Sequence, residues 1–295
     1  RYLERAEDTA RLTRAYAHLV MDIPDTAAPG WDILVRIQDA EDNFLERHRA
    51  FNELNVLHFL IAELDSPGSI QSSIIAAREN VRTTRDVLPE EVWEHVNELY
   101  LYTREHAESS VRRHHRQQFL DQVIARCQMI AGIIITTLCR DHAYRFIMVG
   151  QLLERADMTT RIIDVGTSVM LQEERHYTAV DPLIWASLLE SLSAMGTYRR
   201  TIGPLVESAA VVDFVLRDRT LPRSVWFCLD RMRRELHPLK NRDAATKVLE
   251  SARRSLARFS IDGATRDEMH RFIDRFQLRL SKLDDVIRET WFLPG

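Results

Sequence analysis

Two short segments of the chain carry residue types that acid–base and anion-binding chemistry requires. Glu4 and Arg5 open the first segment, and Glu154 and Arg155 repeat the pair near the middle of the chain. A carboxylate can bind an amine or act as a general base, and a guanidinium can clamp a carboxylate or a phosphate. These four residues are therefore the candidate catalytic groups.

Further charges recur beside both pairs. Asp8 and Arg11 follow the first pair, and Asp157 and Arg161 follow the second, so these four are candidate substrate-binding residues. On a helix they border a stripe of small residues that would contact a neighbouring helix. The same pattern also fits interhelical ion pairs that fix the register of a bundle. Burial and pKa shifts, which the sequence does not give, distinguish the two interpretations.

A cationic strip extends the candidate binding residues. Arg78, Arg82 and Arg85 are spaced i, i+4 and i+7, so a helix places them on one face, where they could bind an anion. A solvated charged face is the alternative interpretation. Ser69 and Ser224 each follow a proline and are expected to cap the helices that carry this strip and its counterpart.

The elements that must position these residues are helices. Apolar residues recur at intervals of three and four between Gly/Pro breaks, for example at Phe272, Phe276, Leu280, Leu283 and Ile287, which predicts an all-α fold. One continuous helix is expected from about 140 to 169. The expected breaks lie at Ser66–Ser69, Leu88–Pro89, Asp181–Pro182, Gly203–Pro204 and Leu221–Pro222.

The chain also resembles itself. Besides the Glu-Arg segments, three blocks recur in the same order at similar offsets: Trp31 with Trp185, Val56–Phe59 with Val211–Phe214, and Phe119 with Phe272. Such self-similarity indicates an internal duplication. We expect one domain over 1–295, a duplicated multi-helix bundle whose pseudo-equivalent halves, about 1–145 and 146–295, pack as one body.

Composition excludes several classes of function. The 295 residues have a net charge of −4 and a pI near 6.3, whereas a general nucleic-acid binder is normally basic. The apolar run Met129–Leu138 is too short to span a bilayer, which requires about 20 residues. Cys127, Cys139 and Cys228 lack metal or redox spacing and are interpreted as reduced core residues, which favours the cytoplasm.

No metal or cofactor site is expected from sequence spacing. His58, His142 and His270 have no spaced partners that would complete a zinc site. The Glu-x-x-His motif of di-iron bundles occurs once, at Glu173 and His176 in an expected loop. Phosphate-binding loops and nucleophile elbows are also missing from the sequence.

Several motifs together resemble the bacterial alpha-E family of all-helical proteins named for their Glu-Arg motif. These are Tyr2–Arg11, Arg145–Asp157, Ala77–Asn80 with Arg82 and Arg85, Leu88 to Asn97, and Pro222–Val225. The resemblance covers nearly the whole chain. Because such proteins usually begin with a further segment, Arg1 is expected to be an internal residue of the gene product.

The resemblance also implies partners. Alpha-E genes commonly lie beside, or are fused to, genes for circularly permuted ATP-grasp ligases and transglutaminase-like proteins. This association implies an accessory protein that binds the substrate or a partner in a peptide (amide-bond) ligase system. One alternative is an enzyme that acts on amide, amine or carboxylate groups through its Glu-Arg pairs. Another is a structural scaffold or homodimer, in which the Glu-Arg pairs are interhelical salt bridges.

Overall fold

Helices account for all the regular structure that is described. The computed structural model describes residues 1–23, 30–170 and 181–293, and every regular element in these ranges is an α-helix. The predicted all-α fold is confirmed. The chain divides into two compact units, Arg1–Tyr144 and Arg145–Gly295, and the division falls in the first turn of the long helix α8 (His142–Met170). That helix also confirms the continuous helix expected from about 140 to 169.

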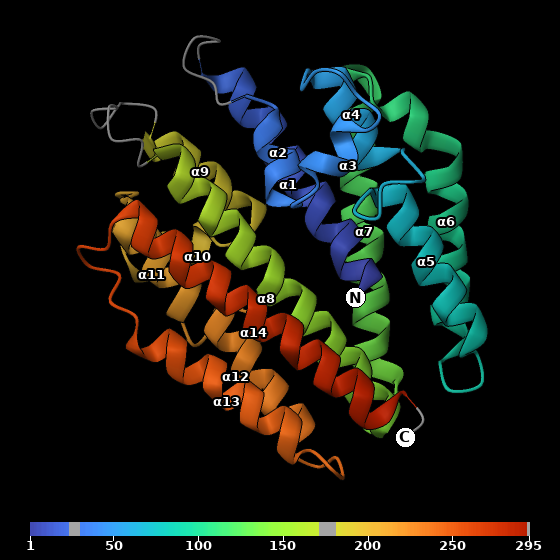
Figure 1. Ribbon diagram of the computed structural model, residues 1–295. Coiled ribbons are helices and arrows are strands. Elements are labelled where there is room, and N and C mark those ends of the chain that lie inside the picture. Colours follow the sequence, from blue (N-terminus) through green and yellow to red (C-terminus); the bar gives the residue numbers. More distant parts are fainter. Residues whose placement is uncertain (24–29, 171–180, 294–295) are drawn as a thin grey trace. The chain divides into compact units, whose positions relative to one another are not determined.

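The first unit is built around a four-helix bundle. Its described helices are α1 (Tyr2–Asp22), α2 (Asp32–Ile37), α3 (Glu41–Leu45), α4 (Glu53–Ile61), α5 (Ile70–Thr83), α6 (Glu90–Ser110) and α7 (Arg113–Thr137). Helices α1 and α6 each pack against both α5 and α7, which closes a ring of four helices (Figure 1). The short helix α4 contacts α1, α2, α5 and α6, and so covers part of the bundle.

The second unit continues from α8 with α9 (Asp181–Ser191), α10 (Met195–Thr201), α11 (Ser208–Arg217), α12 (Val225–Leu236), α13 (Asp243–Arg258) and α14 (Arg266–Trp291). Helix α13 packs against α12 and α14. Side chains of α8 bond to α14 and to the residues before α12, through Thr160 with Gln277 and Thr159 with Arg223. The four long elements of this unit therefore have the same neighbours as α1, α5, α6 and α7 in the first unit.

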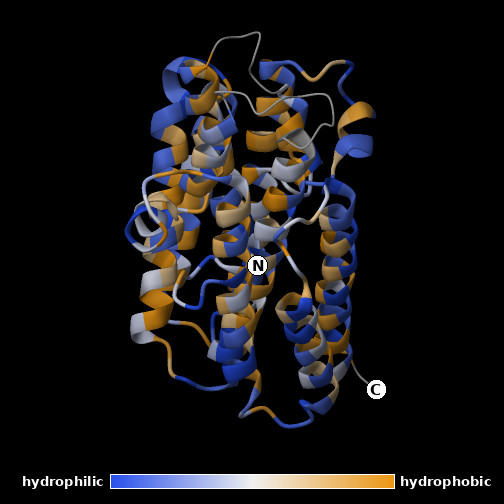
Figure 2. Cartoon of the chain, turned by 90° about the vertical axis from the view of Figure 1, so that its left-hand side faces the viewer, coloured by the Kyte–Doolittle hydropathy of each residue, from blue (hydrophilic) through white to orange (hydrophobic). Residues whose placement is uncertain are grey.

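The helices begin where the sequence predicts. The side chains of Ser69 and Ser224 accept hydrogen bonds from the third residue beyond each of them, at the starts of α5 and α12, and confirm the two predicted caps. Thr265 and Glu268 form a capping box at the start of α14. The expected Gly/Pro breaks fall between helices or, at Asp181–Pro182, at the first residues of α9. Every helix carries both hydrophobic and hydrophilic residues (Figure 2), as amphipathic packing requires.

The two units share a turn and a ring contact. After α2 and after α9 the chain turns through a residue with positive φ, Asp39 at 54° and Ser193 at 53°. In the cores, the rings of Phe44 and Phe59 meet edge-on at 5.2 Å and 79°. Those of Tyr198 and Phe214 do so at 5.5 Å and 78°. These features agree with the predicted duplication. The duplication, and the packing of the halves as one body, stay predictions.

Two expectations about apolar side chains are modified. Cys127 and Cys228 are buried, as expected, but Cys139 is exposed, because it lies just past the end of α7 in the connection to α8. Helix α7, unlike its apolar run Met129–Leu138 alone, has the length and composition of a membrane-crossing helix, and it is the one such helix among the described residues. It packs against α1 and α6 as a core helix of the first unit.

Candidate functional site

The charged side chains of the first motif are buried. Glu4, Glu7, Asp8 and Arg11 each expose 5% or less of their surface. The Nε of Arg11 donates to Oε1 of Glu7 over 2.8 Å, one helical turn away. An uncompensated buried charge destabilises a fold by several kcal/mol, so this bond offsets part of the free-energy cost of burying both charges. The pair lies within one helix, whereas the structural alternative expected pairs between helices.

Cys127 of α7 lies close to this group of charges. Burial raises the pKa of the Cys127 thiol, and the negative charges of Glu7, Glu4 and Asp8 raise it further, while Arg11 acts in the opposite direction. A thiol must ionise to attack an electrophile or bind a metal. Cys127 is therefore a neutral core residue rather than a nucleophile.

Arg5 and Thr9 attach α1 to the turn that precedes α5. Arg5 Nη1 donates to the carbonyl of Pro67 over 3.5 Å, and Thr9 Oγ1 donates to the carbonyl of Gly68 over 3.3 Å. Thr9 Oγ1 in turn accepts from Nε2 of Gln38 over 2.7 Å. A Cβ on Gly68 would lie 2.2 Å from Oε1 at the end of the Gln38 side chain, so any larger residue here would displace that amide. Within the first unit, Arg5 thus binds backbone.

The second motif repeats part of this arrangement. Glu154 is buried, and the Nε of Arg161 donates to Oδ2 of Asp157 over 2.8 Å. Thr159 Oγ1 donates to the carbonyl of Arg223 over 3.1 Å, as Thr9 does to Gly68. The Asp157–Arg161 pair differs in burial, because both side chains are about one-quarter exposed.

Two further positions of the second motif can be compared with their counterparts, and one of them differs in residue type. Met158 occupies the position of Asp8 and is buried. The second motif therefore lacks a counterpart of the buried acid Asp8, as the sequence indicated. Arg155 is half-buried, as Arg5 is.

The predicted arginine strip faces α6. Arg78 Nε donates to Oδ1 of Asn97 over 2.8 Å, and its guanidinium lies 5.2 Å from the ring centre of Trp93 and 4.6 Å from that of Tyr100. The guanidinium of Arg85 also lies over the Trp93 ring, 4.7 Å from its centre. Arg78 on α5 and Arg85 just beyond the end of α5 thus share Trp93 of α6, which holds them by cation–π attraction.

Arg82 has a different partner. It forms two hydrogen bonds with the carboxylate of Glu79, of 2.9 and 2.6 Å, and both side chains are more than half exposed. The hydrogen bond with Glu79 raises the pKa of Arg82. Helical spacing placed the three arginines on one face, but only Arg78 and Arg85 are brought together. These contacts are separate from those of the Glu-Arg motif. Arg5 contacts the turn before α5, whereas Arg78 lies about 12 Å along α5 from the start of that helix.

Comparison with known proteins gives the family. The Alpha-E family, described as a predicted alpha-helical domain with a conserved ER motif, matches residues 1–292. The chain belongs to the Alpha-E family. The Glu-Arg pairs of α1 and α8 fit the ER motif of that description, and their glutamates are buried.

The similar proteins are longer. The whole chain is 25% identical, over 333 aligned residues, to "Uncharacterized protein Mb2597" of Mycobacterium bovis and to "Uncharacterized protein Rv2567" of Mycobacterium tuberculosis. In each case the match covers 36% of the longer protein. The chain thus spans about a third of the length of these relatives. No solved structure matches.

The Alpha-E motif residues are better placed to hold helices than to turn over a substrate. The carboxylates of Glu4, Glu7, Asp8 and Glu154 are shielded from water, and Glu7 is already paired to a guanidinium. A general base must reach the proton of its substrate. The geometry of each motif therefore favours positioning of α1 and α8, and the catalytic role assigned to these residues from the sequence stays a prediction.

The role of the threonine in each motif and the identity of its hydrogen-bond partners were not predicted from the sequence. Thr9 and Thr159 recur at the same offset as the Glu-Arg pairs, so their repetition was a readable signal. Gln38 and Gly68 could not be found in this way, because their contact with Thr9 depends on how α2 and the turn before α5 pack against α1.

Two groups of histidines and carboxylates are assembled by the fold among the described residues. His48, His58 and Glu63 form one, and Asp164, His270 and Asp274 form the other. In the second, Nδ1 of His270 lies 2.8 Å from Asp164, and its hydrogen bond with that carboxylate raises the pKa of His270. Burial raises the pKa of Asp164, and the bond to His270 opposes it.

Sequence spacing suggested neither group. The Glu-x-x-His motif that it did suggest, Glu173 with His176, lies outside the described residues.

Proposed function

We propose that this Alpha-E chain is a non-catalytic binding component of a peptide (amide-bond) ligase system. In this role it binds a partner or the peptide substrate, and the partners are a circularly permuted ATP-grasp ligase and a transglutaminase-like protein. The burial of the motif carboxylates supports the proposal above all, because a general base must reach the proton of its substrate and these groups are shielded from solvent.

The α5–α6 surface supplies the binding groups. Arg78 is half-buried between Trp93 and Tyr100, and Arg85 is exposed beside Trp93. A guanidinium held against an aromatic ring keeps its N–H donors available for a carboxylate, and its orientation is fixed in advance. Carboxylates occur at peptide C-termini and on acidic side chains, so a peptide or an acidic partner surface fits this site.

The length of the relatives supports a role beside other domains. The Alpha-E region is 36% of the mycobacterial chains, so in those proteins it is joined to other segments. A domain that binds a substrate or a partner gains from such a linkage, because tethering raises the effective concentration of the two parts.

The cytoplasm is the proposed compartment. The three cysteines are free in the structure, and Cys139 is exposed. Exposed thiols persist in reducing compartments. An ATP-dependent ligase partner also requires a compartment that contains ATP.

Co-purification tests the proposal. A circularly permuted ATP-grasp ligase from the same organism would carry an affinity tag, and the Alpha-E chain would carry none. We expect the wild-type chain to co-purify and to increase amide-bond formation by the ligase. Arg85→Ala and Trp93→Ala should weaken both effects, whereas Arg82→Ala should not, because Arg82 is occupied by Glu79 on its own helix.

Two results would contradict the proposal. One is a wild-type chain that neither binds the ligase nor changes its rate. The other is amide chemistry by the isolated chain that Glu154→Gln abolishes while the circular-dichroism spectrum stays unchanged. That second result would favour the enzyme hypothesis, because the substitution removes the charge and keeps the shape of the side chain.

A further inference from the structure

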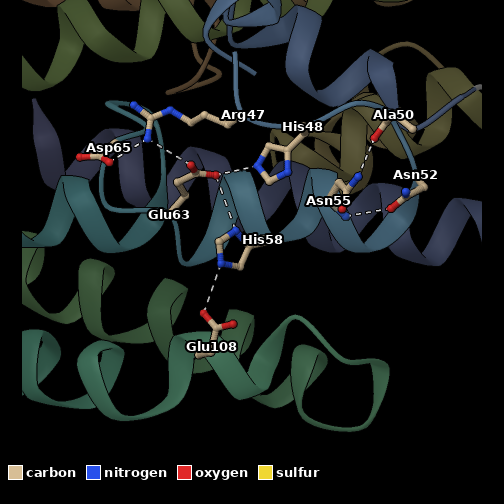
Figure 3. Close-up of polar contacts among 9 residues, drawn as sticks. All are labelled: Arg47, His48, Ala50, Asn52, Asn55, His58, Glu63, Asp65 and Glu108. Carbon is tan, nitrogen blue, oxygen red and sulfur yellow. Dashed lines mark hydrogen bonds and ion pairs between the residues drawn. The ribbon is translucent and has the colours of Figure 1, made fainter. Parts of the chain in front are cut away.

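Three potential metal ligands converge at one end of the first unit, away from the Glu-Arg motif. His48 lies in the loop after α3, His58 on α4, and Glu63 directly after α4. His48 Nε2 lies 2.7 Å from Oε2 of Glu63, and His58 Nδ1 lies 3.6 Å from the same oxygen. One ligand atom of each residue lies within 4.8 Å of those of the other two. Figure 3 shows both rings directed at the Glu63 carboxylate.

The ring of His48 is held in place by the core. It stacks on Phe44 at 4.8 Å and 29°, and it meets Phe59 edge-on at 6.2 Å. Both phenylalanines are completely buried. An imidazole fixed in this way does not have to give up rotamer freedom when it binds a ligand, so the site is organised in advance.

The backbone around His48 is also fixed. Asn52 caps α4 by accepting from the Asn55 backbone N–H, and the Asn55 side chain donates to the carbonyl of Ala50 over 3.0 Å (Figure 3). These bonds tie the loop that carries His48 to the first turn of α4. The ligands on either side of this turn, His48 and His58, are therefore held at a set separation.

One atom of the group lacks a hydrogen bond. The Nδ1 of His58 is buried and has no hydrogen-bond partner in the described part of the chain. Its ring has the opposite nitrogen, Nε2, 3.4 Å from a carboxylate oxygen of Glu108 on α6. A buried nitrogen without a partner requires an explanation, and a role as a metal ligand is one.

We propose that His48, His58 and Glu63 bind a divalent transition-metal ion, with Zn²⁺ as the best match to the ligand set. Two imidazole nitrogens and one carboxylate oxygen are the three protein ligands of many open zinc sites, in which water is the fourth ligand. Tetrahedral zinc with bonds of about 2.0–2.1 Å places its ligand atoms about 3.3 Å apart. The separations of 2.7 and 3.6 Å from Oε2 of Glu63 differ from that value by about 0.6 Å or less.

The residues outside the three ligands fit the same interpretation. Glu108 would accept from Nε2 of His58, which directs Nδ1 towards the ion and increases its basicity. On the other side, Arg47 Nη1 lies 3.4 Å from Oε1 of Glu63 and 2.7 Å from Asp65, so it orients the carboxylate and leaves Oε2 to the ion.

The site is expected once per chain. At the matching offsets of 154 and 155 residues, the second unit has Ile202, Asp213 and Asp218 in place of His48, His58 and Glu63. Neither histidine is repeated, so the second unit cannot form this ligand set. Sequence spacing does not reveal this site, because nine residues separate His48 from His58 and four separate His58 from Glu63, which matches no common zinc motif. The turn between α3 and α4 brings them together.

Zinc titration of the untagged full chain tests the site. After removal of metal with a chelator, calorimetry with Zn²⁺ should show one saturable site, and Zn²⁺ should raise the thermal unfolding midpoint. His58→Gln and Glu63→Gln should abolish the binding and the shift. Glu108→Gln, on an exposed side chain, should weaken binding by about tenfold or more. His270→Gln is the matched control, because it removes the histidine of the other carboxylate group and should leave the affinity unchanged.

Circular dichroism of each variant separates lost binding from lost folding, and Glu108→Gln provides a readout that does not disturb the α3–α4 turn. Co²⁺ in place of Zn²⁺ should give visible absorption bands of a low-coordinate site with nitrogen and oxygen ligands. The absence of saturable Zn²⁺ binding by the wild-type chain would overturn the proposal. So would binding that survives His58→Gln and Glu63→Gln but is lost in His270→Gln.

Discussion

Arg11 and Glu7 form a buried ion pair one turn apart on α1, with Nε and Oε1 separated by 2.8 Å. Arg161 and Asp157 form a bond of the same length and spacing on α8, but both side chains are about one-quarter exposed. Since desolvation decides what an isolated charge costs, the two pairs form a matched comparison.

Arg11→Met should therefore destabilise the protein far more than Arg161→Met. The first leaves Glu7 charged and buried and should lower the free energy of unfolding by about 3–5 kcal/mol. The second should cost about 1 kcal/mol or less. Urea unfolding followed by circular dichroism measures both. Equal losses in the two variants would mean that burial does not decide the cost of breaking these pairs.

Gly68→Ala should displace the side-chain amide of Gln38. The new Cβ would lie 2.2 Å from the Gln38 Oε1, so the amide must move and its 2.7 Å bond to Thr9 must lengthen or break. The lost bond should lower the free energy of unfolding by about 1 kcal/mol. In a Gln38→Ala background the clash and the bond are both absent, so Gly68→Ala should then be nearly neutral. A cost that is the same in both backgrounds would disprove the explanation.

His270 should make the stability of the second unit depend on pH. Its pKa is raised from an ordinary value of 6.5, chiefly by the hydrogen bond with Asp164. A raised pKa means that the pair stabilises the fold fully below that ordinary value, and that the contribution is lost as pH rises through the folded-state pKa.

His270→Gln should accordingly lower the thermal unfolding midpoint at pH 6 and have little effect at high pH. The His270 side chain is about half exposed, so the free energy involved is at most about 1 kcal/mol. Thermal scans of the wild-type chain and the variant from pH 5.5 to about 9 measure it. A difference that grows with pH would contradict this sign.

The cysteines should differ in reactivity. Cys139 is exposed, Cys127 and Cys228 are buried, and burial raises the pKa of Cys127. A thiol reagent should therefore modify one cysteine in the folded chain and all three in guanidinium chloride. Cys139→Ser should remove the fast reaction. Rapid modification of Cys127 in the native protein would show that the interior beside the first motif opens readily.

Sequence patterns predicted the helices better than the contacts between them. The caps at Ser69 and Ser224 and the long helix α8 follow from local signals, because capping and hydrophobic period depend on nearby residues. The placement of Cys139 was wrong for a related reason. An apolar run continues to that residue in the sequence, but α7 ends at Thr137 and the chain leaves the core.

The candidate sites show the same division. Helical spacing correctly grouped Asp157 with Arg161 on one helix, but it could not show that Arg82 bonds to Glu79 while Arg78 and Arg85 share Trp93. Those choices depend on which side chains α6 presents. The His48 group required the turn between α3 and α4, for which no periodic signal exists in the sequence.

The glutamates of the Alpha-E motif are covered from solvent in both α1 and α8. Buried residues of this kind identify members of a family by their shared fold and do not indicate what each member binds. Surfaces such as the α5–α6 face can then diversify from member to member while the signature stays the same. Differences in function between family members should therefore be sought on those exposed surfaces rather than in the shared motif residues.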